Sequence, residues 1–328
     1  MALTLESASE GLQLKKTEKI SFLIDLWILP IILGVPGNIL TVIVATRHQS
    51  KRLSPSVYMA AMGVVDTIFL LDRTVALVTN KLLLADQIDT DPLWLFRSQV
   101  FIFHTSTILS GLFLAGMSID RLIAVKFPMD APRLCTTKRA KTVVITLSFL
   151  IVAFNIHIFY MIRYFRDDQL GIYATVMTLP ELPQLEVVAT GYYVVIGTVL
   201  PFTIIFTTNV LIITSLRKAS KERKKLESAQ NVRLEKDTQY MTRMLIFVSL
   251  AYIILSLPFR LFHLLMRIPP LSYDLSVFDS KKYYVVQSWC LGIVWMLNYA
   301  TNFYLYCIGG GRKYRQEAKT VLKKMFPC

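Results

Sequence analysis

The chain is dominated by long stretches that contain no charged residue. Four of them are uncharged over at least 20 residues, and they run over Val100–Ile119, Thr142–Ile162, Val187–Leu216 and Tyr283–Ile308. A helix of about 20 apolar residues crosses the hydrocarbon layer of a bilayer, which is about 30 Å thick. Each stretch is therefore long enough to span a membrane.

Three further apolar stretches are interrupted by a few charges. They run over Ile20–Ala45, Pro55–Asn80 and Met244–Met266, and their charged residues are Asp25, Asp66, Asp72, Arg73 and Arg260. The strands of a membrane barrel alternate in polarity over about ten residues, and these stretches do not alternate. The sequence therefore predicts an all-α membrane protein, folded as a bundle of seven transmembrane helices.

The composition agrees with this fold class. Hydrophobic residues make up 54% of the chain and charged residues only 18%, whereas soluble domains are about 25% charged. A soluble protein would have to hide several uncharged helices from water, so we disfavour that alternative. No internal repeat or low-complexity tract is visible, which argues against transporter folds built from duplicated halves.

The distribution of Lys and Arg predicts the orientation in the membrane. With the N-terminus outside, the inner segments hold 24 of the 36 Lys and Arg residues and the outer segments hold 10. Positive residues are enriched in cytoplasmic loops. We predict an extracellular tail over 1–19, the bundle over 20–308 and a cytoplasmic segment over 309–328, in a multi-pass protein of the plasma membrane. The net charge of +14 then faces anionic lipids, and no nucleic-acid partner is predicted.

A short helix is predicted after the last span. Gly309, Gly310 and Gly311 end the span, and one helical face then carries Tyr314, Ala318, Leu322 and Met325. Basic residues flank this face, which is typical of an amphipathic helix lying in the membrane interface.

The cysteines provide no disulfide framework. Cys135 falls in an inner segment, Cys290 and Cys307 fall in the last span, and Cys328 ends the chain. No pair lies in the outer segments, where oxidation is expected, so we predict no extracellular disulfide. Cys328 is a candidate for lipidation by a palmitoyl chain, with an unmodified thiol as the alternative.

The inner end of the third span carries the most specific motif. It reads Ser118-Ile119-Asp120-Arg121-Leu122-Ile123-Ala124-Val125. An Arg at the membrane boundary is costly unless it is paired, and Asp120 supplies the partner. Weaker motifs follow one another in the other spans: Gly37-Asn38, Asp66, Pro201, Pro258 and Asn302-Phe303-Tyr304-Leu305-Tyr306.

In order and spacing these motifs resemble those of rhodopsin-like G-protein-coupled receptors, over nearly the whole chain. Several positions depart from the family pattern and indicate a divergent member, for which a neuropeptide-receptor type is considered. These are Leu122 in place of Tyr, Phe303 in place of Pro, Ser256 in place of Trp, Asn209 in place of Tyr, and Phe96 near the position of an outer Cys. The fourth span also lacks the family's Trp.

The resemblance implies three sets of functional residues. Coupling to a heterotrimeric G protein and the accompanying helix switch are assigned to Asp120, Arg121, Pro258, Asn302 and Tyr306. An allosteric sodium ion is assigned to the oxygen-bearing side chains of Asp66, Ser110, Asn298 and Asn302. The alternative for Asp66 is a hydrogen-bonded carboxyl group that joins helices without an ion. No other cofactor or metal is predicted.

Eight side chains toward the outer ends of the spans are predicted to line a ligand cavity. They are Arg73, Gln99, Phe103, His104, Thr107, Arg260, His263 and Gln287. The two arginines offer forked donors to a carboxylate or to peptide carbonyls, so the predicted ligand is a peptide or a small acid. For Arg73 the alternative is a pair with Asp72 or a side chain that snorkels outward to the membrane surface. The two histidines are interpreted as packing residues rather than metal ligands.

Two ligand classes are disfavoured by single residues. Phe103 stands where amine receptors carry an Asp, which argues against a biogenic amine. Met296 stands where opsins carry the Lys that binds retinal, and covalent retinal needs that amine.

No catalytic motif is found, so an enzyme is not predicted. The predicted function is a receptor that passes binding of an extracellular ligand to a G protein. The alternatives are an ion or solute transporter or channel, with a path along the intramembrane charges, and a seven-helix scaffold that has lost its response to ligand.

Overall fold

The fold is seen in a computed structural model of the 328-residue chain. The structure describes residues 26–47, 53–84, 93–167, 172–177, 183–223, 232–266 and 278–325. The predicted tail over 1–19 and the lipidation candidate Cys328 lie outside the described residues.

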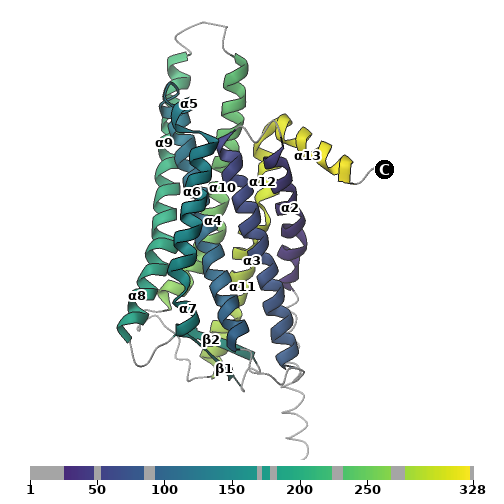
Figure 1. The fold of residues 1–328 in the computed structure, drawn as a ribbon, viewed down its shortest axis with the longest axis vertical. Helices are drawn as coiled ribbons and strands as arrows, with labels where there is room; N and C mark the ends of the chain where they lie inside the picture. Colours follow the sequence, from purple (N-terminus) through teal and green to yellow (C-terminus); the bar gives the residue numbers. More distant parts are fainter. Residues whose placement is uncertain are drawn as a thin grey trace, which may run out of the picture.

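Long helices that lie side by side form one bundle (Figure 1). The first three rods are α2 (Ile28–Thr46), α3 (Ser54–Leu84) and α4 (Leu93–Lys126). The fourth is α6 (Thr137–Asn155), which continues after a turn as α7 (Ile158–Met161), and the fifth joins α8 (Pro183–Val194), η2 (Val195–Val199) and α9 (Leu200–Arg223). The last two are α10 (Val232–Leu265) and α11 (Phe278–Ala300) with α12 (Asn302–Gly309). The predicted fold class, a seven-helix bundle, is confirmed.

Length and apolarity alone identify most of these rods as membrane spans. Five helical segments in the described part of the chain meet both conditions: Ile28–Thr46, Trp94–Lys126, Thr137–Met161, Val187–Lys218 and Thr242–Leu265. The other two rods are α3, which carries buried Asp66 and Asp72, and α11, and both pack against α2 in the same bundle.

The two ends of the bundle differ in their small elements (Figure 1). The short helix α5 (Ala131–Leu134) and the helix α13 (Gly311–Met325) lie at one end, which we call the α13 end. The strands β1 (Ile162–Asp167) and β2 (Ile172–Met177) lie at the opposite end, the hairpin end. They pair antiparallel, with Ile162 opposite Met177. No strand is predicted from the sequence here, because the segment has no clear alternation of polar and apolar residues.

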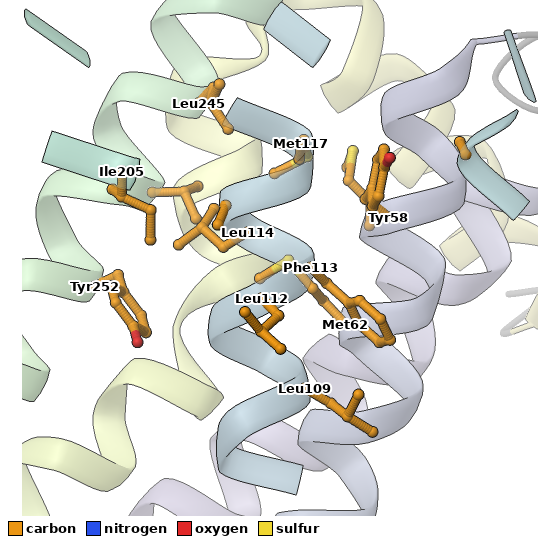
Figure 2. Close-up of a cluster of buried hydrophobic side chains, with 14 of the residues drawn as sticks. Tyr58, Met62, Leu109, Leu112, Phe113, Leu114, Met117, Ile205, Leu245 and Tyr252 are labelled. Carbon is orange, nitrogen blue, oxygen red and sulfur yellow. The ribbon is translucent and has the colours of Figure 1, made fainter. Parts of the chain in front are cut away.

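Helix α4 runs through the centre of the bundle and contacts α3, α6, α9 and α10. Figure 2 shows its apolar side chains pointing in both directions. Tyr58 and Met62 of α3 lie on one side of α4, and Ile205 and Tyr252 lie on the other. The α4 residues of this cluster are all buried: Ile108, Leu109, Leu112, Phe113, Leu114, Ala115 and Met117. A helix buried all round is apolar all round, which explains the uncharged stretch over 100–119.

A proline explains the change of helix type in the fifth rod. Pro201 has no N–H, so it cannot donate to the carbonyl of Gly197 four residues earlier, and its ring crowds that carbonyl. The turn just before it widens into the π-helix η2, in which the Leu200 N–H bonds to the Val195 carbonyl. The Gly197 carbonyl is thereby released for another donor.

Helix α13 was predicted correctly in type but with a slightly different apolar face. It turns away from the bundle axis (Figure 1) and packs on α2 and α12. The buried residues are Ala318 and Val321, each 4% exposed, whereas Leu322 is 37% exposed. They pack with Val44 of α2. The face is rotated because α13 covers the end of α2, and spacing within α13 cannot reveal where that neighbour lies.

Candidate functional site

The Asp120–Arg121 motif forms a buried polar cluster at the α13 end. Ser54, the first residue of α3, donates a hydrogen bond of 2.7 Å from its hydroxyl to Asp120 Oδ2. The same oxygen lies 3.6 Å from Nη2 of Arg121. All three side chains are buried. The carboxylate therefore receives a neutral donor from α3 and a cation from its own helix, as a buried acid requires.

Cys135, in the segment between α5 and α6, adds a contact to this cluster. Its Sγ atom donates to the Asp120 backbone carbonyl over 3.3 Å. Burial raises the pKa of the Cys135 thiol to about 11, and the negative charge of Asp120 adds to the rise. Nothing in the sequence indicates this contact, because Cys135 lies between α5 and α6 and Asp120 belongs to α4.

The raised pKa predicts an unreactive thiol. In a chain with Cys290, Cys307 and Cys328 replaced by Ser, alkylation of Cys135 at pH 7.5 should be about a hundredfold slower than that of an ordinary thiol. The measurement is the rate of iodoacetamide labelling between pH 7 and 10, which should rise without reaching a plateau. The chain unfolded in detergent serves as the control, and there the midpoint should return to about 8.5. A midpoint near 8.5 in the folded protein contradicts the prediction.

The other predicted switch residues lie in the sixth and seventh rods. Pro258 lies inside α10, and Tyr306 is fully buried, with its ring 6.0 Å from that of Tyr314 in α13. The seventh rod is interrupted at Thr301, between α11 and α12. This break occurs although Phe303 replaces the proline of the family motif.

A second polar cluster lies deep between α3, α4 and α12. Asp66 is fully buried and accepts two hydrogen bonds of 2.7 Å, from the Ser110 hydroxyl to Oδ1 and from Asn302 Nδ2 to Oδ2. Asn298, one turn before Asn302, is also buried. The structure therefore brings Asp66, Ser110 and Asn302 into one contact network and leaves Asn298 in a buried position nearby along the same rod.

A cavity of about 280 Å³ opens between α4, α8, η2, α10 and α11. Five of the eight predicted ligand-binding residues line it: Phe103, His104, Thr107, Arg260 and His263. The remaining wall consists mainly of aromatic and aliphatic side chains, among them Ile108, Tyr193, Phe259 and Trp295. Small-molecule sites are typically apolar with a few polar groups that fix the ligand.

The other three predicted residues are not part of the cavity lining. Arg73 pairs with Asp72 through Nε, 3.1 Å from Oδ2, and through Nη2, and its guanidinium lies over the Phe103 ring at 4.6 Å. Gln99 is buried and Gln287 is exposed. The pair of Arg73 with Asp72 is one of the alternatives that the sequence left open.

Trp295 is one of the cavity residues that the sequence did not predict. It stacks face to face on Phe259 with ring centroids 4.4 Å apart and an interplanar angle of 5°. It also makes edge contacts with Phe69 and Phe103, at 5.5 Å and 5.3 Å. Ser256 replaces the tryptophan expected in the sixth span, and the large ring beside this helix comes instead from α11. The apolar sequence of α11 does not indicate that Trp295 contacts aromatic residues of three other helices.

Asn209, another departure from the family pattern, has a partner in the next helix. Its Nδ2 lies 2.7 Å from Oγ of Ser249, and its Oδ1 lies 3.0 Å from the same oxygen. Both side chains are buried. The substitution thus joins α9 to α10 by a hydrogen bond inside the bundle.

A comparison with known protein families matches residues 37–304 to the family described as "7 transmembrane receptor (rhodopsin family)". The match covers most of the chain, including the charged cluster, the Asp66 cluster and the whole cavity. The chain belongs to this family. It is a multi-pass membrane receptor of the G-protein-coupled type, as the motifs indicated. A search among curated proteins found no match.

Proposed function

We propose that this receptor transmits the binding of an extracellular ligand to a heterotrimeric G protein by rearrangement of its helices. The ligand is a peptide or a small acidic molecule. The protein resides in the plasma membrane, with its N-terminus outside and its C-terminus in the cytoplasm, as the distribution of basic residues indicates. This function needs no catalytic step within the chain.

The observation that carries the proposal is the arrangement along α4. Phe103 and Thr107 line the cavity, and Asp120 and Arg121 form the charged cluster at the other end of the same helix. The residues between them belong to the buried core. A ligand that favours one packing of the bundle therefore shifts the population of states at both ends.

The G-protein proposal is tested by nucleotide exchange. Full-length receptor in lipid nanodiscs is mixed with purified heterotrimers of each class, and binding of a non-hydrolysable GTP analogue is measured with and without candidate ligands. We expect at least one heterotrimer to respond. Arg121→Ala should abolish the response, because it removes the cation that meets the G protein.

The outcomes also separate the alternatives. Wild type and Arg121→Ala should bind ligand with similar affinity if the residue acts in coupling alone. Ion flux through receptor vesicles, without any exchange, would favour the transporter or channel. No response of any heterotrimer, with no flux, would favour the ligand-silent scaffold.

We further propose that sodium binds at the Asp66 cluster. Carboxylate, hydroxyl and amide oxygens are hard ligands that suit such a cation, and Asp66, Ser110, Asn298 and Asn302 would supply them. The two 2.7 Å contacts gather Ser110 of α4 and Asn302 of α12 around the Asp66 carboxylate. Asn302 donates from its amide nitrogen in this arrangement, so its amide would turn to present the oxygen to the ion. The ion would contribute a positive charge that holds these helices together in the resting state.

Replacing Asp66 by Asn tests this site. In the wild type, sodium chloride should raise the unfolding temperature more than the same concentration of potassium chloride. Asp66→Asn should respond equally to both salts, because the neutral amide no longer attracts a cation. Asp72→Asn is the matched control, since Asp72 is paired with Arg73, and it should keep the sodium response. Equal responses of the wild type to both salts would count against the site.

A further inference from the structure

The Arg260 side chain extends from α10 into the bundle. Only one of its three guanidinium nitrogens is hydrogen-bonded to a described residue. Nη1 donates to the Gly197 carbonyl over 2.5 Å and lies 2.8 Å from the Thr198 hydroxyl. The carbonyl is the one that Pro201 leaves without an N–H donor. One nitrogen of Arg260 thus completes the backbone of the fifth rod.

The other edge of the same guanidinium has no such partner. Nε and Nη2 are buried and make no hydrogen bond with any residue that the structure describes. The Tyr299 hydroxyl interacts with Arg260 electrostatically but does not meet hydrogen-bond geometry. A guanidinium has five N–H donors, and those of Nε and Nη2 point in parallel, as a bidentate carboxylate requires.

The buried acids of the described bundle are already engaged elsewhere. Asp72 pairs with Arg73, Asp120 pairs with Arg121, and Asp66 accepts from Ser110 and Asn302. No carboxylate of the described residues forms an ion pair with Arg260. A cation inside the membrane is costly unless a negative charge accompanies it. Arg260 therefore lacks a counter-charge within the described bundle, and it lines the cavity.

The size and lining of the cavity limit which ligands can bring a negative charge to Arg260. Its volume of about 280 Å³ lies just below the range of about 300–1,000 Å³ for small-molecule sites. Apart from Arg260, its wall is mostly aromatic and aliphatic and includes Phe103, Phe259 and Trp295, and the Arg260 guanidinium lies 6.0 Å from the centre of the Trp295 ring. Such a wall fits a compact ligand with one negative group and an apolar body, and it is too small for an extended peptide.

We propose that the cavity binds a small monocarboxylic acid with an aromatic or aliphatic body, whose carboxylate pairs side-on with Nε and Nη2 of Arg260. This inference rests on the proposed receptor function and narrows its ligand class. Because both nitrogens are buried, the guanidinium turns toward the acid as the ligand enters. That turn loosens the bond from Nη1 to Gly197, and so the carboxylate acts on the contact between α10 and η2.

The test uses matched acids and amides on the full-length receptor in nanodiscs. The probes are 4-phenylbutyrate, octanoate and indole-3-acetate, each compared with its uncharged primary amide. The readout is the unfolding temperature as a function of probe concentration, which gives an apparent affinity without any signalling step. We expect at least one acid to stabilise the wild type while its amide does not.

Three variants locate the effect. Arg260→Gln removes the charge and should weaken the apparent affinity for the acid at least tenfold. Arg260→Lys keeps the charge but loses the forked geometry, and it should retain an intermediate affinity. Arg133→Gln is the control, because Arg133 is exposed and lies in α5 at the α13 end, and the affinity of this variant for the acid should stay within twofold of wild type.

Each result either supports or contradicts the proposed acid site. Stabilisation by an acid that is lost in Arg260→Gln and kept in Arg133→Gln supports the site. Equal stabilisation by acid and amide, an unchanged affinity in Arg260→Gln, or no stabilisation by any of the three acids overturns it. Nucleotide exchange on the same samples tests the receptor function separately. If the acid binds but no nucleotide exchange follows, the proposed receptor function is contradicted and the acid site is not. If another ligand drives exchange but no acid binds, the acid site is contradicted and the receptor function is not.

Discussion

Trp295→Ala should destabilise the receptor by about 3–5 kcal/mol, the usual cost of truncating a buried aromatic residue. Trp295 is 3% exposed, and its ring contacts come from three other helices: Phe69 in α3, Phe103 in α4 and Phe259 in α10. Removing the indole therefore leaves a cavity where four helices meet. The measurement is the unfolding temperature of purified receptor in one detergent.

Trp94→Ala is the matched control for this substitution. Trp94 lies near the start of α4 and is 70% exposed, so its removal should change stability by no more than about 0.5 kcal/mol. Trp295→Phe keeps an aromatic face on Phe259 and should fall between the two alanine variants. Equal losses for Trp94→Ala and Trp295→Ala would show that the aromatic cluster does not hold the helices together.

Gly309→Ala should loosen the packing of the sixth rod at the α13 end. An added Cβ would lie 2.6 Å from the Met244 Cα atom, a backbone contact that only movement of a helix can relieve. Overpacking of this kind costs about 1–3 kcal/mol. Alanine in a helix interior normally gains about 0.5–1 kcal/mol over glycine, so a measured loss reflects the clash. The unfolding temperature should fall.

The same variant should raise nucleotide exchange in the absence of ligand. The added methyl group should push the Met244 segment of α10 away from α12, and under the proposed function this movement favours the state that couples to the G protein. Gly191→Ala is the control, because nothing lies within 4 Å of a Cβ added there, and its stability and exchange should match the wild type. Higher stability of Gly309→Ala together with unchanged exchange would refute the predicted clash.

The contrast between Arg73 and Arg260 shows which contacts the sequence could predict and which it could not. Both Arg73 and Arg260 were predicted to face a ligand, and the sequence offered a pair with Asp72 only as an alternative for the first. The pair forms because Asp72 is adjacent on the same helix. The partner of Arg260 is the Gly197 carbonyl, 63 residues away, and no local pattern identifies it.

The sequence alone determined the fold class, the number of spans and the family. The reason is physical, because hydrocarbon imposes one length and one polarity on every segment that crosses it, and both are visible residue by residue. The tertiary structure alone decided which side chains meet across helices. Trp295 beside Phe259, Asn209 beside Ser249 and Cys135 beside Asp120 depend on how each rod is rotated toward its neighbours. That rotation is set by packing between segments distant in the chain, which the apolar stretches leave undetermined.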